Sequence, residues 1–431
     1  MQGRLDGKLA LLYTLLVLQI LIVVIYVAST PPPDIIAPTT QTSVSFVKIE
    51  KSKAVQNVPP VDHSASHLQT IKSNIYLKDR HTLQSFKKYN HTWCWRDGVD
   101  VTRMANSGEI ERKRCICDQG WHGSDCGQPE VVWRAIMASK QNIKLEQRKT
   151  VRRIIYVFSL NDYNSAIAEV IVEELYKVVD LFVICDFSNA EDNFKHKLAK
   201  GLLQQGQDKI LYINIANKIR KPLRVISKYI WEKVCQVVRN LRDDDIYVTT
   251  ESEQILNPRA LMFLKVYDGW PQPIGFRLRW SVFGFFWQHP LKTSIVIGAS
   301  TISLLRGAYH QNSLLLPKDF DGEVSERESL GLVIGDLNHY GGWYCYLCQD
   351  PANIVTSLHQ KANVKEKNAK LTIDVPYIED LIETGIWLDN KTALLRAYKS
   401  RDPYFAPDIV MNNTWKYDWL VENFYAKLDY Y

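Results

Sequence analysis

Residues 154–160, IIYVFSL, form a short run of β-branched and aromatic residues that predicts a buried strand. Three more segments of this kind follow, rich in β-branched and aromatic residues as buried strands are: VDLFVICD at 179–186, KILYINI at 209–215 and IYVT at 246–249. Between them, apolar positions recur at helical spacing in residues 166–177, 193–203 and 222–241. Strands separated by helices indicate a mostly parallel sheet, so the sequence predicts an α/β domain.

Carboxylates follow two of these strands, where ligands of open parallel sheets bind. Asp186 ends the second strand and either reaches a nucleotide or caps the strand. Glu251 and Glu253 follow the fourth strand, and one divalent cation can bind both while substrate phosphates complete its shell. The alternative is a solvated acidic loop, which is what we predict for residues 243–245. No Gly-rich phosphate loop follows any strand, so a nucleotide would be held by metal and side chains.

The net charge of +6 raises the question of a nucleic-acid ligand. Residues 1–90 hold ten Lys and Arg against five Asp and Glu, whereas the rest of the chain holds 43 against 42. A protein that follows a nucleic-acid backbone usually has a basic stripe on its folded domain. The large part of the chain is electrically balanced, so we expect no nucleic-acid partner.

An apolar run at residues 9–28 precedes the folded part. About 20 residues at 1.5 Å each span a hydrocarbon core of about 30 Å, so the run predicts a transmembrane anchor behind a tail of residues 1–8. Arg4 and Lys8 precede it, which places the tail in the cytoplasm and the rest in the lumen or outside the cell. A cleaved signal peptide is the alternative, although its apolar region is usually about 7–15 residues long.

Residues 29–90 contain no glycine and no tryptophan, and they lack helical or strand periodicity, which is typical of an extended stem. The next segment contains CICDQGWHGSDC at 115–126, whose spacing resembles the second half of an EGF-like module, here placed at residues 91–128. A metal knuckle is the alternative, but no further Cys or His has the spacing for it. We expect the disulfides Cys94–Cys115 and Cys117–Cys126, which form in oxidising compartments.

Three sequons agree with a lumenal or extracellular location, because N-glycosylation requires it. They begin at Asn90, Asn390 and Asn412. Each is a weak signal alone, and the cysteine pattern is the stronger evidence.

Three long blocks carry a resemblance to a known family. Residues 263–270 (FLKVYDGW) are similar to its F-L-K-L-Y-D-G-W, residues 279–287 (RWSVFGFFW) to R-K-S-L-Y-G-F-F-W, and residues 339–348 (HYGGWYCYLC) to H-F-A-G-W-H-C-S-W-C. The chain thereby resembles the β-1,4-mannosyl-glycoprotein 4-β-N-acetylglucosaminyltransferase family, and is N-acetylglucosaminyltransferase III-like. The resemblance extends from about residue 94 to about residue 426, without the stem.

The resemblance implies a Rossmann-like catalytic domain of the GT-A type at residues 150–431. It also implies a single-pass type II protein of the Golgi membrane whose catalytic domain is lumenal. The implied reaction is transfer of GlcNAc from UDP-GlcNAc, with Mn²⁺ or Mg²⁺, to the core β-mannose of an N-glycan on a glycoprotein. The product would be a bisecting β1,4 linkage, formed with inversion.

The chain departs from the family at the metal site. The family has D-D-A-D-E-I-P where residues 250–256 are TESEQIL, so the metal pair is Glu251 and Glu253 in place of two aspartates. Each arm is longer by one methylene, and octahedral metal geometry tolerates little misplacement. Thr250 and Gln254 also remove two charges from the neighbourhood. We expect a working transferase, with altered metal preference, another acceptor or lost activity as alternatives.

Other residues are candidates for roles in the implied reaction, although the sequence does not identify the general base. His339 is a candidate third metal ligand or diphosphate contact, against a structural histidine. Asp336 and Glu379 are candidates for the general base that inversion requires, against solvated surface carboxylates. Arg279 either binds phosphate through its planar fork or forms an ion pair on a strand.

Aromatic residues and the remaining cysteines leave further alternatives. Trp287 and Trp343 either stack on sugar faces or belong to the core. Cys345 and Cys348 form a structural bridge or pair elsewhere. Cys185 and Cys235 are either buried thiols or partners of that later pair.

Two other classes of function compete with the transferase. One is a glycan-binding protein that has the transferase fold but has lost its metal chemistry through Thr250 and Gln254. The other is an extracellular adhesion or signalling protein built on the EGF-like module, which the long α/β pattern disfavours.

Overall fold

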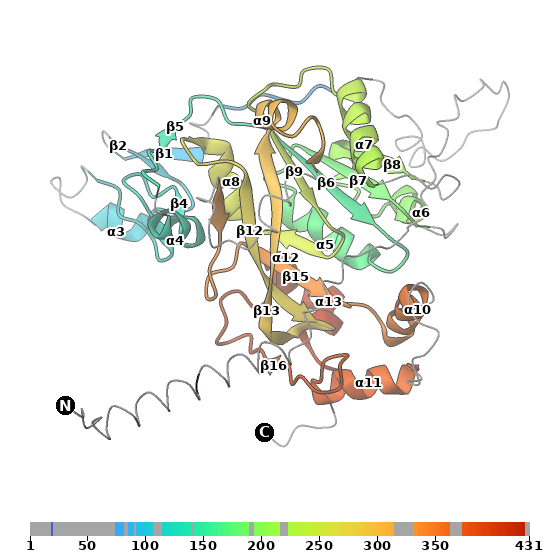
Figure 1. The fold of residues 1–431 in the computed structure, drawn as a ribbon. Coiled ribbons are helices and arrows are strands. Elements are labelled where there is room, and N and C mark those ends of the chain that lie inside the picture. Colours follow the sequence, from blue (N-terminus) through green and yellow to red (C-terminus); the bar gives the residue numbers. More distant parts are fainter. Residues whose placement is uncertain are drawn as a thin grey trace, which may run out of the picture. The chain divides into compact units, whose positions relative to one another are not determined.

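The structure is a computed structural model, in which the described residues from 74 onward belong to one unit (Figure 1). The tail at 1–8, the anchor at 9–28 except Gln19, and Asn90 lie outside the described residues. Within the described part of the chain, no helix has the length and hydropathy needed to cross a bilayer. Besides Gln19, the described residues are 74–81, 85–89, 92–106, 114–139, 141–188, 194–215, 223–313, 331–362 and 373–426.

A mixed sheet occupies the centre of this unit, and all four expected strands are in it. β6 (Ile154–Leu160), β7 (Leu181–Asp186), β8 (Ile210–Asn214) and β9 (Ile246–Thr250) run parallel in the order β8-β7-β6-β9. Their carboxyl ends therefore meet at one edge of the sheet. The predicted α/β class is confirmed.

Successive side chains of a strand point to opposite faces, and β6 accordingly alternates between two hydrophobic cores. One core packs against α5 (Ser165–Leu175) and α8 (Pro258–Val266). The other packs against α7 (Leu223–Val237) and α9 (Ile302–Gly307). Helices on both faces explain why β6 and β7 are apolar at nearly every position.

A long antiparallel hairpin extends the sheet beyond β9. It consists of β12 (Ile274–Val282) and β13 (Gly284–Thr301), and β13 pairs with β9 on its other side. β12 also pairs in parallel with β14 (Leu332–Ile334) and β15 (Gly342–Tyr346). β10 (Gln254–Leu256) is antiparallel to β15, and β16 (Leu395–Arg396) is antiparallel to β13.

A small module precedes the α/β part and has the two expected disulfides, Cys94–Cys115 and Cys117–Cys126. Its own small core is centred on Cys94, Val99 and Met104. The elements of the module are β1 (Phe86–Tyr89), β2 (Thr92–Trp95), α3 (Val101–Asn106), β3 (Trp121–His122) and β4 (Gln128–Pro129).

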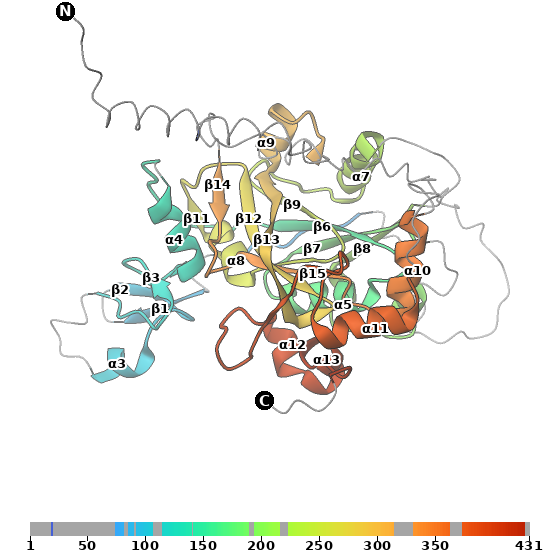
Figure 2. The same ribbon diagram turned by 60° about the horizontal axis from the view of Figure 1, so that its bottom comes forward.

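Helices near the C-terminus complete the unit. In both ribbon views α10 lies next to α11, and α12 next to α13 (Figure 2). The bounds are α10 (Pro351–Ala362), α11 (Val375–Thr384), α12 (Asp408–Asn412) and α13 (Thr414–Val421). The other elements are α4 (Glu130–Ala138), β5 (Glu146–Gln147), α6 (Phe194–Ala199), a 3-10 turn (Gln207–Lys209) and β11 (Tyr267–Asp268).

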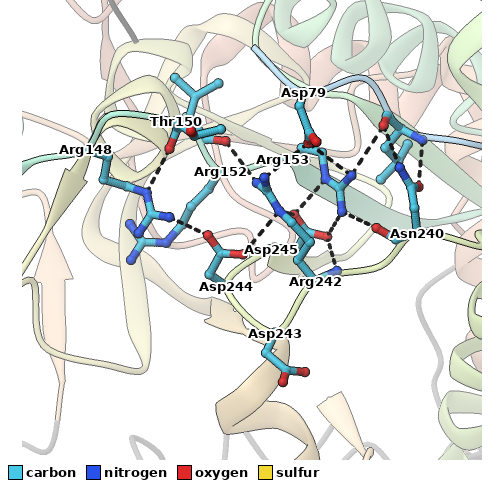
Figure 3. Close-up of polar contacts among 12 residues, drawn as sticks. Asp79, Arg148, Thr150, Arg152, Arg153, Asn240, Arg242, Asp243, Asp244 and Asp245 are labelled. Carbon is cyan, nitrogen blue, oxygen red and sulfur yellow. Dashed lines mark hydrogen bonds and ion pairs between the residues drawn. The ribbon is translucent and has the colours of Figure 1, made fainter. Parts of the chain in front are cut away.

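Charged groups gather at the amino ends of β6 and β9 (Figure 3). The Arg153 side chain is 1% exposed, and it donates from Nε to Asp245 Oδ1 at 2.9 Å and from Nη2 to Oδ2 at 2.6 Å. The Asp245 carboxylate is fully buried and also accepts from the backbone N–H of Arg242 at 2.8 Å. A solvated loop was therefore the wrong prediction for Asp245, although it holds for the exposed Asp243.

The same network holds residues 74–81, which the sequence analysis assigned to the stem. The Asn240 side chain accepts from the backbone N–H of Leu77 at 2.9 Å and donates to its carbonyl at 2.8 Å. Asp79 lies 3.3 Å from Arg153 and 3.1 Å from Arg242. Because β1 is also ordered within the module, the folded part begins before the expected boundary at residue 90.

Candidate functional site

The loop after β9 meets the loop after β6 at the carboxyl edge of the sheet. The Nδ2 group of Asn164 donates to the carbonyl of Ser252 at 3.2 Å, and Asn161 Nδ2 lies 3.5 Å from Ser252 Oγ. Asn164 is 1% exposed, so its amide is a fixed support. The carboxylates of the predicted metal pair, Glu251 and Glu253, flank the anchored Ser252.

The residues that replace the family's charges are neutral for a structural reason. The Thr250 hydroxyl donates to the hydroxyl of Tyr156 in the core at 3.1 Å. Gln254 is 5% exposed, and its Oε1 accepts from the backbone N–H of Glu251 at 2.7 Å. Burying a carboxylate at either position would carry a large desolvation cost. Thr250 and Gln254 thus fix the shape of the loop that carries the carboxylates.

Tyr344 brings the two glutamates into one neighbourhood. Its phenol hydrogen-bonds to the Glu253 carboxylate, and its pKa is raised, first by burial and then by the charges of Glu253 and Glu251. The backbone N–H of Cys345 also donates to the Glu253 carbonyl at 2.9 Å. Both carboxylates therefore act on one phenol, from positions two residues apart in the loop after β9.

This pair has the composition of a minimal magnesium or manganese site. Such ions bind one or two protein carboxylates and take their other ligands from phosphate and water. Within the described residues, no group of three or more His, Cys, Asp or Glu side chains is arranged to hold a metal. The two glutamates fit the ion only if a substrate supplies the remaining oxygens.

His339 is not brought to this pair, which corrects its expected role as a third ligand. Cys345 of β15 lies beside Glu253, whereas His339 precedes the start of that strand at Gly342. At about 3.3 Å per residue, residues 342–345 alone put roughly 10 Å between them. His339 Nδ1 instead lies 3.0 Å from Asp336 Oδ1, and its Nε2 lies 3.9 Å from Glu130 Oε1.

Asp336 contacts His339 and not the glutamates, so the structure does not place it as a base beside Glu251 and Glu253. Its Oδ1 accepts the backbone N–H groups of Asn338 at 2.7 Å and of His339 at 2.8 Å. The pKa of Asp336 is lowered by these bonds and by His339, which outweigh its partial burial. The other candidate base, Glu379, lies on α11, where burial and then the Glu379 charge raise the pKa of Tyr425.

Arg279 is an interior residue, so its expected phosphate contact is wrong and the ion-pair alternative holds. The side chain is fully buried, and its Nε lies 3.1 Å from Asp402 Oδ2. Its Nη1 donates to Ser281 Oγ at 2.6 Å and to two backbone carbonyls. Burial lowers the pKa of Arg279, and Asp402 opposes that effect.

The two expected sugar-stacking tryptophans are core residues. The indole N–H of Trp343 donates to the carbonyl of Tyr404 at 2.8 Å, and that of Trp287 to the carbonyl of Ile382 at 2.8 Å. Their side chains are 5% and 9% exposed. Gly385 packs directly on the Trp287 ring.

Asp186 is fully buried at the end of β7, where it accepts from the Tyr212 hydroxyl and from the backbone N–H of Ser188. This arrangement is that of a strand-end cap, the second of the two alternatives. Asn390 and Asn412 are both exposed, as a glycosylation acceptor must be.

The remaining cysteines follow the simpler alternative. Cys345 and Cys348 bridge to each other directly after the residue that contacts the glutamates. Cys185 and Cys235 are free thiols, and burial raises the pKa of both.

Sequence analysis missed an aromatic group next to Glu253. Trp280 packs edge-on against Tyr344 with ring centroids 4.9 Å apart, and Tyr346 packs against Trp387 at 5.5 Å. Three of these rings, other than Tyr344, are only partly buried against the core. The sequence could have indicated this group. Trp280 stands in the same resemblance block as Trp287, and Tyr344 and Tyr346 stand in the same block as Trp343.

Known proteins are similar to this chain in sequence. The chain is 29% identical to the β-1,4-mannosyl-glycoprotein 4-β-N-acetylglucosaminyltransferase of Mus musculus over 345 residues, which cover 73% of this chain. The expected resemblance is confirmed. The protein of the same name from Rattus norvegicus is also 29% identical, and that from Homo sapiens 28%. The chain spans 62% of the length of the mouse and rat relatives. No protein-family model matches it.

The first resemblance block has a structural role. Asp268 pairs with Arg148 at 2.8 Å and also with Arg152, while the buried Lys265 donates to Asp180 at 2.6 Å. These contacts attach α8 to the segment before β6 and to the loop before β7. The block thus accounts for part of the likeness without taking part in the candidate site.

Proposed function

We propose that this chain is a glycosyltransferase that moves GlcNAc from UDP-GlcNAc to the core β-mannose of an N-glycan, forming a β1,4 linkage with inversion. The observation that supports it most is the pair Glu251 and Glu253. This pair follows β9 at the carboxyl edge of the parallel strands, where nucleotides bind in such sheets. The relatives are named for transfer of N-acetylglucosamine to a mannosyl glycoprotein, which supports the same reaction.

The strand order supports a GT-A type of domain. β8-β7-β6-β9 is a doubly wound parallel arrangement with an antiparallel continuation through β13. A nucleotide would lie across the ends of β6, β7 and β9. Residues 9–28 would anchor the chain as a type II protein of the Golgi membrane, with this domain in the lumen, in keeping with the module's disulfides.

Glu251 and Glu253 would hold Mn²⁺ or Mg²⁺. Such an ion supplies a Lewis acid that offsets charge on a diphosphate leaving group. The chain's own contribution is to orient the carboxylates. Gln254 holds the backbone of Glu251, and Tyr344 holds the side chain of Glu253, so neither must be ordered when substrate binds.

Transfer forms one bond and breaks one. An acceptor hydroxyl oxygen attacks the anomeric carbon of GlcNAc, and the bond to the phosphate oxygen breaks with its electron pair on UDP. The acceptor proton passes to a base within hydrogen-bond reach. Attack from the face opposite the leaving group inverts the anomeric centre.

The test is to assay the full chain in membranes with UDP-GlcNAc, Mn²⁺ and a panel of N-glycans, and to determine the product linkage. Glu251→Gln and Glu253→Gln should each reduce turnover by at least a hundredfold, because they remove charge that acts on the leaving group. Asp243→Asn, an equally conservative change at an exposed loop carboxylate, is the matched control and should retain full activity. Full turnover in both glutamine variants would refute the assignment.

A glycan-binding protein without transferase activity is the second candidate, favoured by the neutral Thr250 and Gln254. Titration calorimetry with UDP-GlcNAc separates the two. The transferase requires binding that Mn²⁺ strengthens. Binding of the N-glycan without metal-dependent binding of UDP-GlcNAc would favour the second candidate.

A further inference from the structure

Beside Glu253 the sheet presents a group of aromatic rings that the proposed reaction has not yet used. We infer that Trp280 and Trp387, together with Tyr344 and Tyr346, form the subsite that binds a pyranose ring of the acceptor. The inference rests on the proposed function, because it assigns the acceptor to a specific surface next to the glutamates.

Lys292 lies against two of these rings. Its exposed ammonium lies over the Trp280 ring at 5.4 Å from the centroid and over the Trp387 ring at 5.0 Å. Both indole faces therefore border the same space, and a solvated group reaches that space.

The distance between the Trp280 and Trp387 rings limits the size of a ligand that can contact both. With one ammonium near both rings, the two centroids are no more than about 10 Å apart. A ring held between two faces at contact distances of about 4 Å on each side needs roughly 8 Å. This upper limit leaves room for one pyranose to contact both indoles, once the flexible Lys292 side chain moves aside.

The groups around these aromatic rings suit a sugar ligand. A pyranose has apolar C–H faces and a rim of hydroxyl groups, so it suits aromatic rings with polar groups at their edges. Trp280 contacts Tyr344, whose hydroxyl bonds to Glu253, and Tyr346 also lies within the field of the Glu253 carboxylate. The Lys292 ammonium next to the indoles can bond to sugar hydroxyls.

Packing against the main core and against His289 holds these rings in place. Trp280, Tyr346 and Trp387 pack against the main core from outside and are only partly buried. His289 packs against both indoles, with its ring 5.2 Å from Trp387 and 6.1 Å from Trp280. Its Nδ1 accepts the backbone N–H of Lys292 at 3.1 Å, which fixes the start of that side chain. The rings are thereby ordered before any ligand arrives.

The test uses the full chain and two probes, a mannose-containing N-glycan core oligosaccharide and UDP-GlcNAc, each titrated separately by calorimetry. Trp387→Ala should weaken oligosaccharide binding about tenfold, since it removes one stacking face. The same variant should leave UDP-GlcNAc affinity unchanged. Trp387→Phe, which keeps a ring, should lose about threefold or less. Trp415→Ala, at an exposed tryptophan of α13, is the control and should match the wild type.

The outcomes separate the subsite from the reaction. Unchanged oligosaccharide affinity in a folded Trp387→Ala protein would overturn the subsite, as would an equal loss of affinity for both probes. If wild-type chain binds the oligosaccharide through Trp387 but never binds UDP-GlcNAc, the transferase proposal fails and the subsite stands. If transfer proceeds and the KM for the acceptor is the same in Trp387→Ala, the subsite fails and the transferase stands.

Discussion

Replacing Asp245 with alanine should destabilise the fold more than any other single carboxylate change at the amino edge of the sheet. Arg153 is 1% exposed and donates two hydrogen bonds to Asp245, at 2.9 and 2.6 Å, so the variant leaves a buried guanidinium without its main counter-charge. Asp79 remains 3.3 Å away, but it is 60% exposed and screened by water. Removing one partner of a buried pair typically costs about 3–5 kcal/mol.

The assay is urea denaturation of the Asp245→Ala chain, followed by tryptophan fluorescence. A loss of about 3–5 kcal/mol would consume a large part of a typical stability of about 5–15 kcal/mol. Asp243→Ala is the matched control, because that carboxylate is 72% exposed and pairs only at the surface with Arg306. We expect the control to lose no more than about 1 kcal/mol.

A double variant tests the cause. Arg153→Met combined with Asp245→Leu removes both charges and should recover most of the stability, because two apolar side chains leave no unpaired ion. If the free energies of unfolding of Asp245→Ala and Asp243→Ala differ by less than about 1 kcal/mol, burial of an uncompensated Arg153 is not what the network prevents. The same conclusion follows if the double variant is no more stable than Asp245→Ala.

Three other predictions concern stability. Burial raises the pKa of Glu174 to about 7 from 4.5, so the folded state binds the proton more tightly and stability falls as pH rises through that window. Glu174→Gln should therefore raise Tm by a few degrees above pH 7 and leave it unchanged near pH 4.5; equal Tm gains at both pH values would contradict this. Cys115→Ser opens a bridge with a separation of 21 residues and should cost about 3 kcal/mol, against about 1.5 kcal/mol for Cys348→Ser, whose bridge has a separation of 3, as chemical denaturation would show. A chain that starts at residue 85 keeps β1 but lacks the segment 74–81, and it should melt well below one that starts at residue 43; identical melting curves would mean that Leu77 and Asp79 contribute nothing.

The parallel half of the sheet was predictable because its local signals agree with one another. β6 and β7 are continuous apolar runs that helices cover on both faces, and this pattern is read directly from the sequence. The hairpin of β12 and β13 was not assigned, because its strands are held by pairing with distant partners such as β9 and β15. Non-local pairing has no signature in a short window of sequence.

The candidate site was predictable in its carboxylates and not in its other members. Glu251 and Glu253 stand out because charge after a buried strand is conspicuous. Residue type alone could not separate Trp280 from Trp343, since an indole suits both a core and a sugar face. What distinguishes them is whether the indole N–H donates to a backbone carbonyl and whether a solvated cation reaches the ring, and both depend on contacts far apart in the chain.

The ion network and the candidate site lie at opposite ends of the same strand, and this separation bears on how the protein can be altered. From Asp245 to Glu251 is six residues of mostly extended chain, roughly 20 Å. Substitutions more than about 7–10 Å apart usually have additive effects. The amino edge is therefore a place where robustness to heat or to damaging mutations can be increased by repacking, while the surface that meets nucleotide and glycan keeps its shape.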